Sequence, residues 1–336
     1  MFKILESNDL KSHLSKFEVL PVEEISSSVP HKVKVSVCIM TYNQKEFIEE
    51  CINSILRQET TFSFEIIIGE DESNDGTREI CLAYAKKYPE KIRLLLHKRA
   101  NNIKINDRPT GRFNFLYNLI HARGEFIALC EADDFWTDNF KLTKQVQLLE
   151  NNPQCTGCFH DFQINYVGSS RSRIQKYRGL NQFDLEYFLK KNPYIATASL
   201  VFKKSILRNV PNSITKLFAA DFLLKYIILL SGNFVHVDSV MSAYNKGTEG
   251  SWTSIKKDQK RIDVEFLDNI SALLEVNTLT EHKHQVVVLH KINDIVKRYR
   301  RRSVALMNYK QQAVMVFKNP RLLDLKFLKL FLKRFV

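Results

Sequence analysis

The sequence predicts an α/β fold in which a mostly parallel sheet is flanked by helices and followed by a helical C-terminal region. Three observations lead to this prediction. Short apolar runs alternate with helical patterns over residues 33–150. The runs are apolar almost throughout, which suits strands that are covered on both faces. Beyond residue 256, apolar residues recur at helical spacing. We therefore expect an N-terminal extension at 1–32, an α/β domain at 33–255 and a helical region at 256–336.

Composition narrows the class of protein. The chain has 336 residues, of which 44% are hydrophobic and 26% are charged, so a disordered chain is excluded. The net charge of +13 favours an anionic partner, which could be a nucleotide phosphate, an acidic membrane surface or a nucleic acid. No signal peptide or membrane-spanning run is expected. Four of the six cysteines lie in predicted strands or helices and are expected to be core thiols in a reducing compartment. Cys155, Cys158 and His160 form only a weak zinc pattern. These features predict a cytoplasmic protein.

The first elements follow one another as strand and helix. Alternating valines predict a strand at 33–40, and Asn43 with Glu46 at capping-box spacing predicts the start of a helix. Pro89 is expected to end the next helix. Further strands are expected at 64–68, 92–96 and 126–130, and further helices from Thr77, at 112–121 and at 139–150.

The second half of the chain is less regular. Further strands are expected at 157–166, 195–202, 234–237 and 240–244, a basic loop at 171–178, and an apolar helix from 219 to Gly232. A basic run lies at 297–302. The segment 321–336 has one basic and one apolar side when drawn as a helix. This pattern predicts either a helix on the inner face of an anionic membrane or a helix docked on the domain.

Acidic side chains crowd the end of the strand at 126–130. Glu131, Asp133 and Asp134 follow it directly. Neighbouring like charges repel, so packing gives no reason for this cluster. Carboxylate oxygens are the ligands that Mg²⁺ or Mn²⁺ takes in proteins, together with substrate phosphates. The alternative is a solvated turn before a helix capped by Asp138.

A second acidic pair supports the cation site. Glu70 and Asp71 follow the strand at 64–68. In parallel sheets, ligands bind beyond the carboxyl ends of the strands. Two acidic groups on one predicted edge favour a binding site over two solvated turns.

The chain resembles the bacterial type of glycosyltransferase family 2, which has the Rossmann-like GT-A fold. The resemblance covers residues 33–254. It rests on several segments that stand in the family's order: 35–43, 65–77, 131–138 with Lys141, Leu142, Gln145 and Val146 after it, 196–202, Asp221 and 244–252.

The resemblance implies an inverting enzyme that moves a sugar from a nucleotide-diphosphate sugar, expected to be UDP-linked, to a hydroxyl group. The acceptor would be a glycan or a lipid-linked oligosaccharide, and the cofactor Mn²⁺ or Mg²⁺. Asp221 would be the general base, although a first-turn acid can also simply complement the helix dipole. Asp133 would bind the metal, together with Glu131 and Asp134. Nucleotide contacts would come from Thr41, Tyr42, Asn43, Glu70, Asp71, Arg112, Asn114 and Ala132, and acceptor or closing-loop contacts from Lys246, Gly250 and Trp252.

Two departures from the family pattern affect the site. Glu131 stands where the commoner residue is Asp, so its carboxylate is expected to reach either the ribose or the metal ion. The family's closing loop often carries a His, whereas here Tyr244 is followed by Asn245, Lys246 and Gly247. A third protein ligand to the metal is therefore left open, and Lys246 is expected to contact the diphosphate.

Two other function classes compete with this interpretation. A sugar-phosphate nucleotidyltransferase would normally carry a glycine-rich phosphate loop near the N-terminus, and residues 40–43 have no glycine. A non-catalytic carbohydrate or nucleic-acid binder would suit the net charge. The basic runs at 171–178 and 297–302 lack the interleaved aromatic residues of a nucleic-acid platform, so no nucleic-acid partner is expected. The oligomeric state is open.

Overall fold

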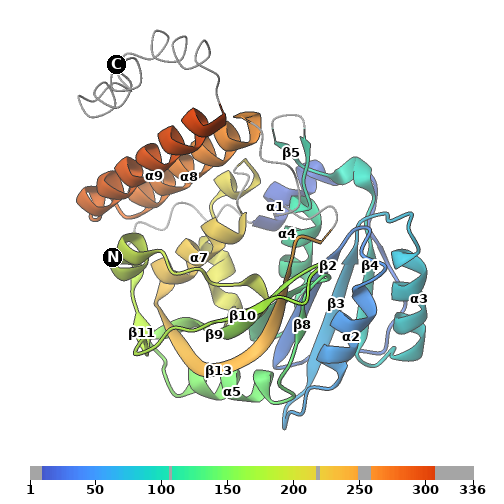
Figure 1. The fold of residues 1–336 in the computed structure, drawn as a ribbon. Coiled ribbons are helices and arrows are strands. Elements are labelled where there is room, and N and C mark those ends of the chain that lie inside the picture. The colour runs from blue at the N-terminus through green and yellow to red at the C-terminus, as the bar shows by residue number, and fades with distance from the viewer. Residues whose placement is uncertain (1–9, 106–107, 217–219, 249–258, 307–336) are drawn as a thin grey trace, which may run out of the picture.

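The computed structural model describes residues 10–105, 108–216, 220–248 and 259–306 (Figure 1). Several sequence predictions lie outside these residues. They are the two closing-loop residues Gly250 and Trp252 and the amphipathic segment at 321–336. The side chain of Asp221 also lies outside the described part, although its backbone belongs to a described helix.

One large sheet forms the centre of the molecule. Its strands, in spatial order, are β1 (Glu23–Glu24), β4 (Ile92–Leu96), β3 (Phe64–Glu70), β2 (Val35–Thr41), β7 (Phe126–Glu131), β12 (Val201–Lys203), β9 (Cys155–Tyr166), β13 (Asn233–Lys246) and β11 (Gln182–Phe183). Two short strands pair outside this path, β10 (Ser172–Gln175) with β9 and β8 (Phe135–Trp136) with β13. A separate ribbon joins β5 (Lys104–Ile105) to β6 (Arg108–Pro109).

The long strands of the sheet run parallel. β4, β3, β2 and β7 form one parallel block, and β9 runs parallel to β13. The short strand β12 joins the two blocks by pairing antiparallel with both β7 and β9. The carboxyl ends of all these long strands therefore meet at one edge, and the predicted, mostly parallel sheet is confirmed.

Helices cover both faces of the sheet. They are α1 (Leu10–Leu14), α2 (Ile48–Leu56), α3 (Thr77–Lys87), α4 (Arg112–His121), α5 (Lys141–Glu150), α6 (Leu185–Lys191), α7 (Ala220–Ser231), α8 (Gln259–Leu279) and α9 (Gln285–Leu306). Side chains alternate along β2: Val37 and Ile39 pack with α2, α3 and α5, while Cys38 packs into the core of α4 and α7. Beyond α7, α8 and α9 lie side by side (Figure 1). Within the described ranges, no helix combines the length and apolar character needed to cross a bilayer.

The predicted cap at Asn43 is wrong. Helix α2 begins at Ile48, with Phe47 in the cap position. Asn43 has a positive φ of 52°, and its side-chain oxygen accepts a hydrogen bond from the backbone N–H of Asn74 at 3.1 Å. The residue therefore anchors a neighbouring loop and does not start a helix.

Two other predicted elements also differ. The basic loop at 171–178 contains the edge strand β10, whose exposed Arg173 suits a sheet edge that must not pair with other chains. Residues 197–199 of the predicted strand at 195–202 form a 3₁₀ turn. There the hydroxyl of Ser199 donates to the carbonyl of Ala196 at 2.7 Å, which favours a turn over a sheet ladder. Only Val201–Lys203 remain as a strand.

Asparagines of α4 lock the two central strands in place. Asn114 Nδ2 donates to the carbonyl of Gly69 at 2.7 Å, and Asn118 Nδ2 donates to the carbonyl of Ile39 at 3.1 Å. A Cβ atom at Gly69 would collide with Asn114 Oδ1 and would lie 2.5 Å from Asn118 Nδ2. Glycine at position 69 therefore allows the close approach of α4 to β3.

Replacing Gly69 with alanine is expected to lower the free energy of unfolding by about 2–4 kcal/mol, because it overpacks the core and displaces a buried hydrogen bond. Urea denaturation measures this change. Gly111→Ala is the matched control, since no atom lies within 4 Å of its Cβ position and its φ is −70°. An equal effect of the two substitutions would contradict the packing explanation.

Candidate active site

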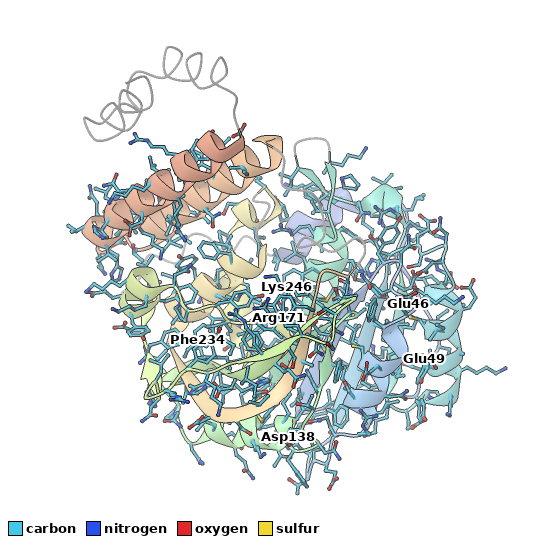
Figure 2. All side chains as sticks on the ribbon, in the orientation of Figure 1. Glu46, Glu49, Asp138, Arg171, Phe234 and Lys246 are labelled. Carbon is cyan, nitrogen blue, oxygen red and sulfur yellow. The ribbon has the colours of Figure 1, made fainter. Side chains whose placement is uncertain are left out.

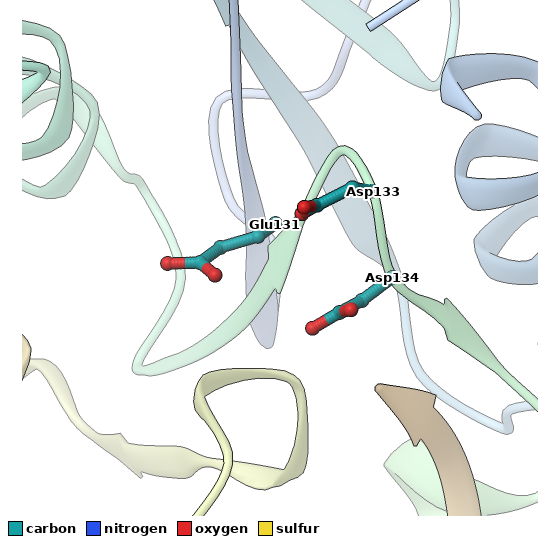
Figure 3. A group of neighbouring side chains, drawn as sticks. All are labelled: Glu131, Asp133 and Asp134. Carbon is teal, nitrogen blue, oxygen red and sulfur yellow. The ribbon is translucent and has the colours of Figure 1, made fainter. Parts of the chain in front are cut away.

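Three carboxylates meet at the carboxyl end of β7. Glu131 is the last residue of the strand, and Asp133 and Asp134 form the turn after it. Their carboxylate oxygens lie within 4.8 Å of one another. Figure 3 shows the three side chains directed to the same side of the turn. Within the described ranges this is the one group of three or more such side chains close enough to hold a metal ion.

Asp134 is the most buried member of the carboxylate cluster. Asp134 is buried, and its Oδ2 atom has no hydrogen-bond partner among the described residues. Burial, and then the charges of Asp133 and Glu131, raise the pKa of Asp134 well above its usual value. Burial also raises the pKa of Asp133. A buried carboxylate with one unpartnered oxygen, beside two further acids that repel it, fits a hard divalent cation.

The end of β13 closes over this cluster. Asn245 donates from its backbone N–H to Asp134 Oδ1 at 3.0 Å and from Nδ2 to the carbonyl of Asp133 at 2.7 Å. Thr248 donates from its hydroxyl to Asp133 Oδ2 at 2.6 Å. The contacts of both residues with the carboxylates were not predicted from the sequence. A signal was available, because Asn245 is a polar residue near the end of β13 and Thr248 is a polar residue two positions after that end.

Lys246, which was predicted to contact a diphosphate, points to the surface. Its ammonium group lies 5.6 Å from the centre of the Tyr166 ring, against which Arg171 of the β9–β10 hairpin also packs (Figure 2). Two cations therefore stand together beside the end of β13.

Asp71 forms the second part of the site, at the end of β3. Its backbone N–H donates to the carbonyl of Thr41 at 3.0 Å, which brings the ends of β2 and β3 together. Its Oδ2 atom accepts hydrogen bonds from Arg99 Nη1 at 3.0 Å and from Asn102 Nδ2 at 3.1 Å. Burial raises the pKa of Asp71 to about 6, against the opposing effects of Asn102 and Arg99. The guanidinium of Arg99 stacks 3.8 Å from the ring centre of Tyr42. Sequence reasoning had missed Arg99 and Asn102.

Glu70 and Asn43 support the loop that carries Asp71. Glu70 is fully buried and is ion-paired with Arg78, and it also accepts the backbone N–H of Ser73 at 2.7 Å. The backbone N–H of Asn43 donates to Ser73 Oγ at 2.9 Å. Together with the bond from the backbone N–H of Asn74 to Asn43 Oδ1, these contacts hold the loop in position.

Three further predicted nucleotide contacts bind the protein backbone. Arg112 is buried and donates from Nη1 to the carbonyl of Ile214 at 2.8 Å. Asn114 holds Gly69, as described above. The backbone N–H of Ala132 donates to the carbonyl of Met40 at 3.3 Å, which places Ala132 between the end of β2 and the carboxylates.

Two tyrosines stand beside the carboxylate cluster. The rings of Tyr194 and Tyr244 are 6.2 Å apart between centres. The pKa of Tyr194 is raised by burial first, then by Tyr244, and further by the charges of Asp134 and Glu131. The residue as a whole is 49% exposed. Sequence reasoning gave no sign of Tyr194, which lies in an irregular stretch.

Residues of helix α5 contact the segments next to the acidic turn. Lys141 is fully buried, donates to Gln145 Oε1 at 2.7 Å and lies 4.0 Å from the ring centre of Trp136. Burial lowers the pKa of Lys141 to about 7. Gln145 Nε2 in turn donates to the carbonyl of Ser199 at 2.9 Å. Lys141 and Gln145, which follow the acidic residues in the sequence, therefore have a structural role next to the acidic turn.

Comparison with known proteins agrees with this geometry. Residues 36–210 match Glycosyl transferase family 2. An uncharacterized protein of Mycobacterium tuberculosis is 31% identical over 253 residues, which cover 75% of this chain and 70% of that protein. Abequosyltransferase RfbV of Salmonella typhimurium is 27% identical over 225 residues, which cover 63% of this chain and 61% of RfbV.

A solved structure shares the fold. S. aureus TarS 1–349 in complex with UDP superposes with a TM-score of 0.56 at 18% sequence identity, over 84% of this chain and 78% of TarS 1–349. The family match, the relatives and the α/β architecture with its acidic edge lead to one conclusion. The chain belongs to glycosyl transferase family 2 and is a glycosyltransferase.

Proposed function

We propose that the protein transfers a sugar, with inversion, from a UDP-linked donor to a hydroxyl of a glycan or lipid-linked acceptor, with the assistance of Mn²⁺ or Mg²⁺. The observation that carries the proposal is the position of two groups of residues at the same edge of the sheet. One is the Asp71 cluster, formed by Asp71, Arg99, Asn102 and Tyr42, and the other is the carboxylate cluster Glu131–Asp133–Asp134. Membership of glycosyl transferase family 2 argues against the two alternative functions, a sugar-phosphate nucleotidyltransferase and a non-catalytic binder. Residues 33–255 would form the catalytic domain, and α8 with α9 would belong to an appended helical region.

The spacing of the strands suits a nucleoside diphosphate. Thr41 pairs with Glu70, and Met40 pairs with Glu131, so the ends of β3, β2 and β7 are level. Neighbouring strands lie about 4.8 Å apart, so Asp71 and the metal cluster are separated by roughly two strand spacings. A nucleotide with its base at Asp71 would place its phosphates toward the three carboxylates.

The Asp71 cluster offers the chemistry to recognise uracil. An ionised carboxylate accepts a hydrogen bond from the imide N–H of this base, and the exposed ring of Tyr42 offers a flat apolar surface. TarS binds UDP and UDP-GlcNAc in its solved complexes, which supports a uridine nucleotide for this chain.

The carboxylates would hold the metal ion. Asp133 and Asp134 are the proposed ligands, and Glu131 would reach the ion or the ribose. A bound divalent cation would neutralise the charge that develops on the leaving diphosphate. Asn245 and Thr248 would orient the two aspartates, because each already donates a hydrogen bond to one of them.

The acceptor side would be built around Asp221. In the proposed reaction its carboxylate takes the proton of the acceptor hydroxyl while the acceptor oxygen attacks the anomeric carbon. The bond between that carbon and the phosphate oxygen breaks, and its electron pair leaves with the diphosphate. One carboxylate suffices for this direct inversion, because a bound metal ion would neutralise the leaving diphosphate and no general acid would be needed. The transition state is expected to resemble the oxocarbenium ion of glycoside hydrolysis. Tyr194 and Tyr244 would flank the reacting sugar.

A panel of nucleotide sugars tests the proposal. Thermal unfolding is measured with UDP-, GDP-, CMP- and dTDP-sugars in the presence of Mn²⁺. A UDP-sugar is expected to raise the melting temperature, because a ligand of the native state stabilises it. Mass spectrometry with the best donor and oligosaccharide acceptors then identifies the product. Stabilisation by a different nucleotide alone would contradict the assignment of uridine.

The pH dependence of nucleotide binding is a separate prediction. The carboxyl of Asp71 is ionised above pH about 6 and neutral below it. Protonation removes the acceptor of the imide hydrogen, so the affinity for UDP, measured without metal ions, should fall as the pH drops below 6. The expected loss is up to about tenfold per pH unit. Calorimetry from pH 5 to pH 8 measures it, and Asp71→Asn should remove the dependence. A flat profile for the unsubstituted protein would contradict the role of Asp71.

A further inference from the structure

A basic pocket lies outside the proposed catalytic centre, where the carboxyl end of α6 packs against α9. This open pocket has a volume of about 390 Å³. Its walls are formed by Lys191, Asn192, Lys291, Asp294, Lys297 and Arg298. Four of these six residues are cationic and one is acidic.

Asp294, the single acidic residue of the pocket, already lies close to two other side chains. Asp294 lies 3.5 Å from Lys297 Nζ and 3.7 Å from His290 Nε2. Lys191, Lys291 and Arg298 have no ion pair with any acid among the side chains that the structure describes. The pocket therefore carries positive charge that the described part of the protein does not neutralise.

The positive charge of Lys291 is energetically unfavourable where it lies. The residue is only 8% exposed, and its pKa is lowered by burial and by the neighbouring Arg298, against the smaller opposing effect of Asp294. A partly buried ammonium group that faces another cation is unfavourable unless an anion joins them. Lys191 could be explained by its place at the carboxyl end of α6, where cations complement the helix dipole. Lys291 and Arg298 lie in the interior of α9 and have no such explanation.

We propose that this pocket binds a phosphate group, which belongs either to a lipid headgroup or to a free phosphorylated molecule. Several lysine and arginine side chains that line one pocket match the several acceptor oxygens of phosphate. The pocket also lies close to Tyr194 along the chain. Lys191 and Tyr194 are three residues apart, so their Cα atoms are separated by at most about 11 Å. A molecule anchored there could present its sugar hydroxyl beside Tyr194; this last step rests on the proposed function.

The test compares two variants that each lose two positive charges. Lys291→Ala/Arg298→Ala alters the pocket, and Lys86→Ala/Lys87→Ala alters the exposed end of α3. Calorimetry with inorganic tripolyphosphate is done in EDTA, so that no metal ion recruits the anion to the carboxylate cluster. Sedimentation with phosphatidylglycerol and phosphatidylcholine vesicles provides the second arm. Circular dichroism checks the fold of each variant.

The pocket variant is expected to lose at least tenfold in affinity for at least one anionic probe, and the α3 variant less than twofold. Loss of tripolyphosphate binding identifies a free phosphorylated ligand, and loss of phosphatidylglycerol binding alone identifies a lipid headgroup. Equal losses in both variants, or none in either, would overturn the proposal. UDP binding with Mn²⁺ is measured in the same variants. If it persists while the phosphate result fails, only the pocket proposal is wrong; if UDP binding fails in the unsubstituted protein, the proposed function is wrong.

Discussion

Replacing Asp133 with alanine is expected to lower the rate of sugar transfer by roughly 10³-fold or more, because it removes a ligand of the ion that stabilises the leaving diphosphate. The substitution also removes the acceptor of the Thr248 hydroxyl, so the end of β13 loses one of its ties to the acidic turn. The measurement is turnover of the donor at saturating Mn²⁺, with circular dichroism as a check of the fold.

Asp138→Ala provides the control for Asp133→Ala. Asp138 is another aspartate of the same segment, but it pairs with Lys144 at 2.5 Å and accepts the backbone N–H of Phe140 at 2.8 Å. Its loss is expected to cost about 1 kcal/mol of stability, as for other caps and local bonds, and to leave turnover within about twofold. Turnover that survives Asp133→Ala, or that falls equally in both variants, would remove the metal role from Asp133.

Replacing Asp221 with asparagine is expected to lower kcat by about 10²–10⁴-fold, the usual contribution of a general base. Asparagine keeps the size of the side chain but cannot take the proton of the acceptor hydroxyl. Binding of UDP with Mn²⁺ should remain within about threefold of the unsubstituted value, since the proposed role of Asp221 concerns the acceptor. Steady-state kinetics and calorimetry on the same preparation measure the two quantities.

The competing explanation of Asp221 makes a different prediction. Asp221 is the second residue of α7, so its charge could serve only the helix dipole. In that case Asp221→Asn would lower the free energy of unfolding by about 0.3–1 kcal/mol and leave kcat nearly unchanged. A normal kcat, or a collapse of UDP affinity together with kcat, would contradict the general-base role.

The sequence predicted the parts of the molecule that follow from periodicity. Continuous apolar runs marked the parallel strands, and acids at two strand ends marked the edge where β3 and β7 finish. Because the register of parallel strands is set by these buried runs, Asp71 and Asp133 could be placed on one edge before the fold was known.

The residues that complete the site could not be predicted in the same way. Thr248 contacts an aspartate that lies 115 positions earlier in the chain, and Tyr194 packs against Tyr244 from a stretch without periodicity. β13 was read as two strands because Asp238 and Ser239 interrupt its apolar pattern, and the structure accommodates them in a bulge between Val237 and Val240.

Glu70 shows how far the role of a single acidic residue can be predicted from the sequence. Its place at a strand end suggested a ligand contact, but the structure pairs its buried carboxylate with Arg78, eight residues further along the chain. Sequence alone does not show which of two adjacent acids, Glu70 or Asp71, an internal arginine will take.

The most direct test is the affinity of the protein for UDP, measured by calorimetry with Mn²⁺ and again with EDTA. If Glu131, Asp133 and Asp134 hold a cation that bridges the protein to the diphosphate, Mn²⁺ should tighten UDP binding at least about tenfold, which corresponds to about 1.4 kcal/mol. Asp133→Ala should abolish that gain and keep the affinity measured in EDTA. Equal affinities of the unsubstituted protein with Mn²⁺ and with EDTA would contradict a metal-assisted donor site at the end of β7.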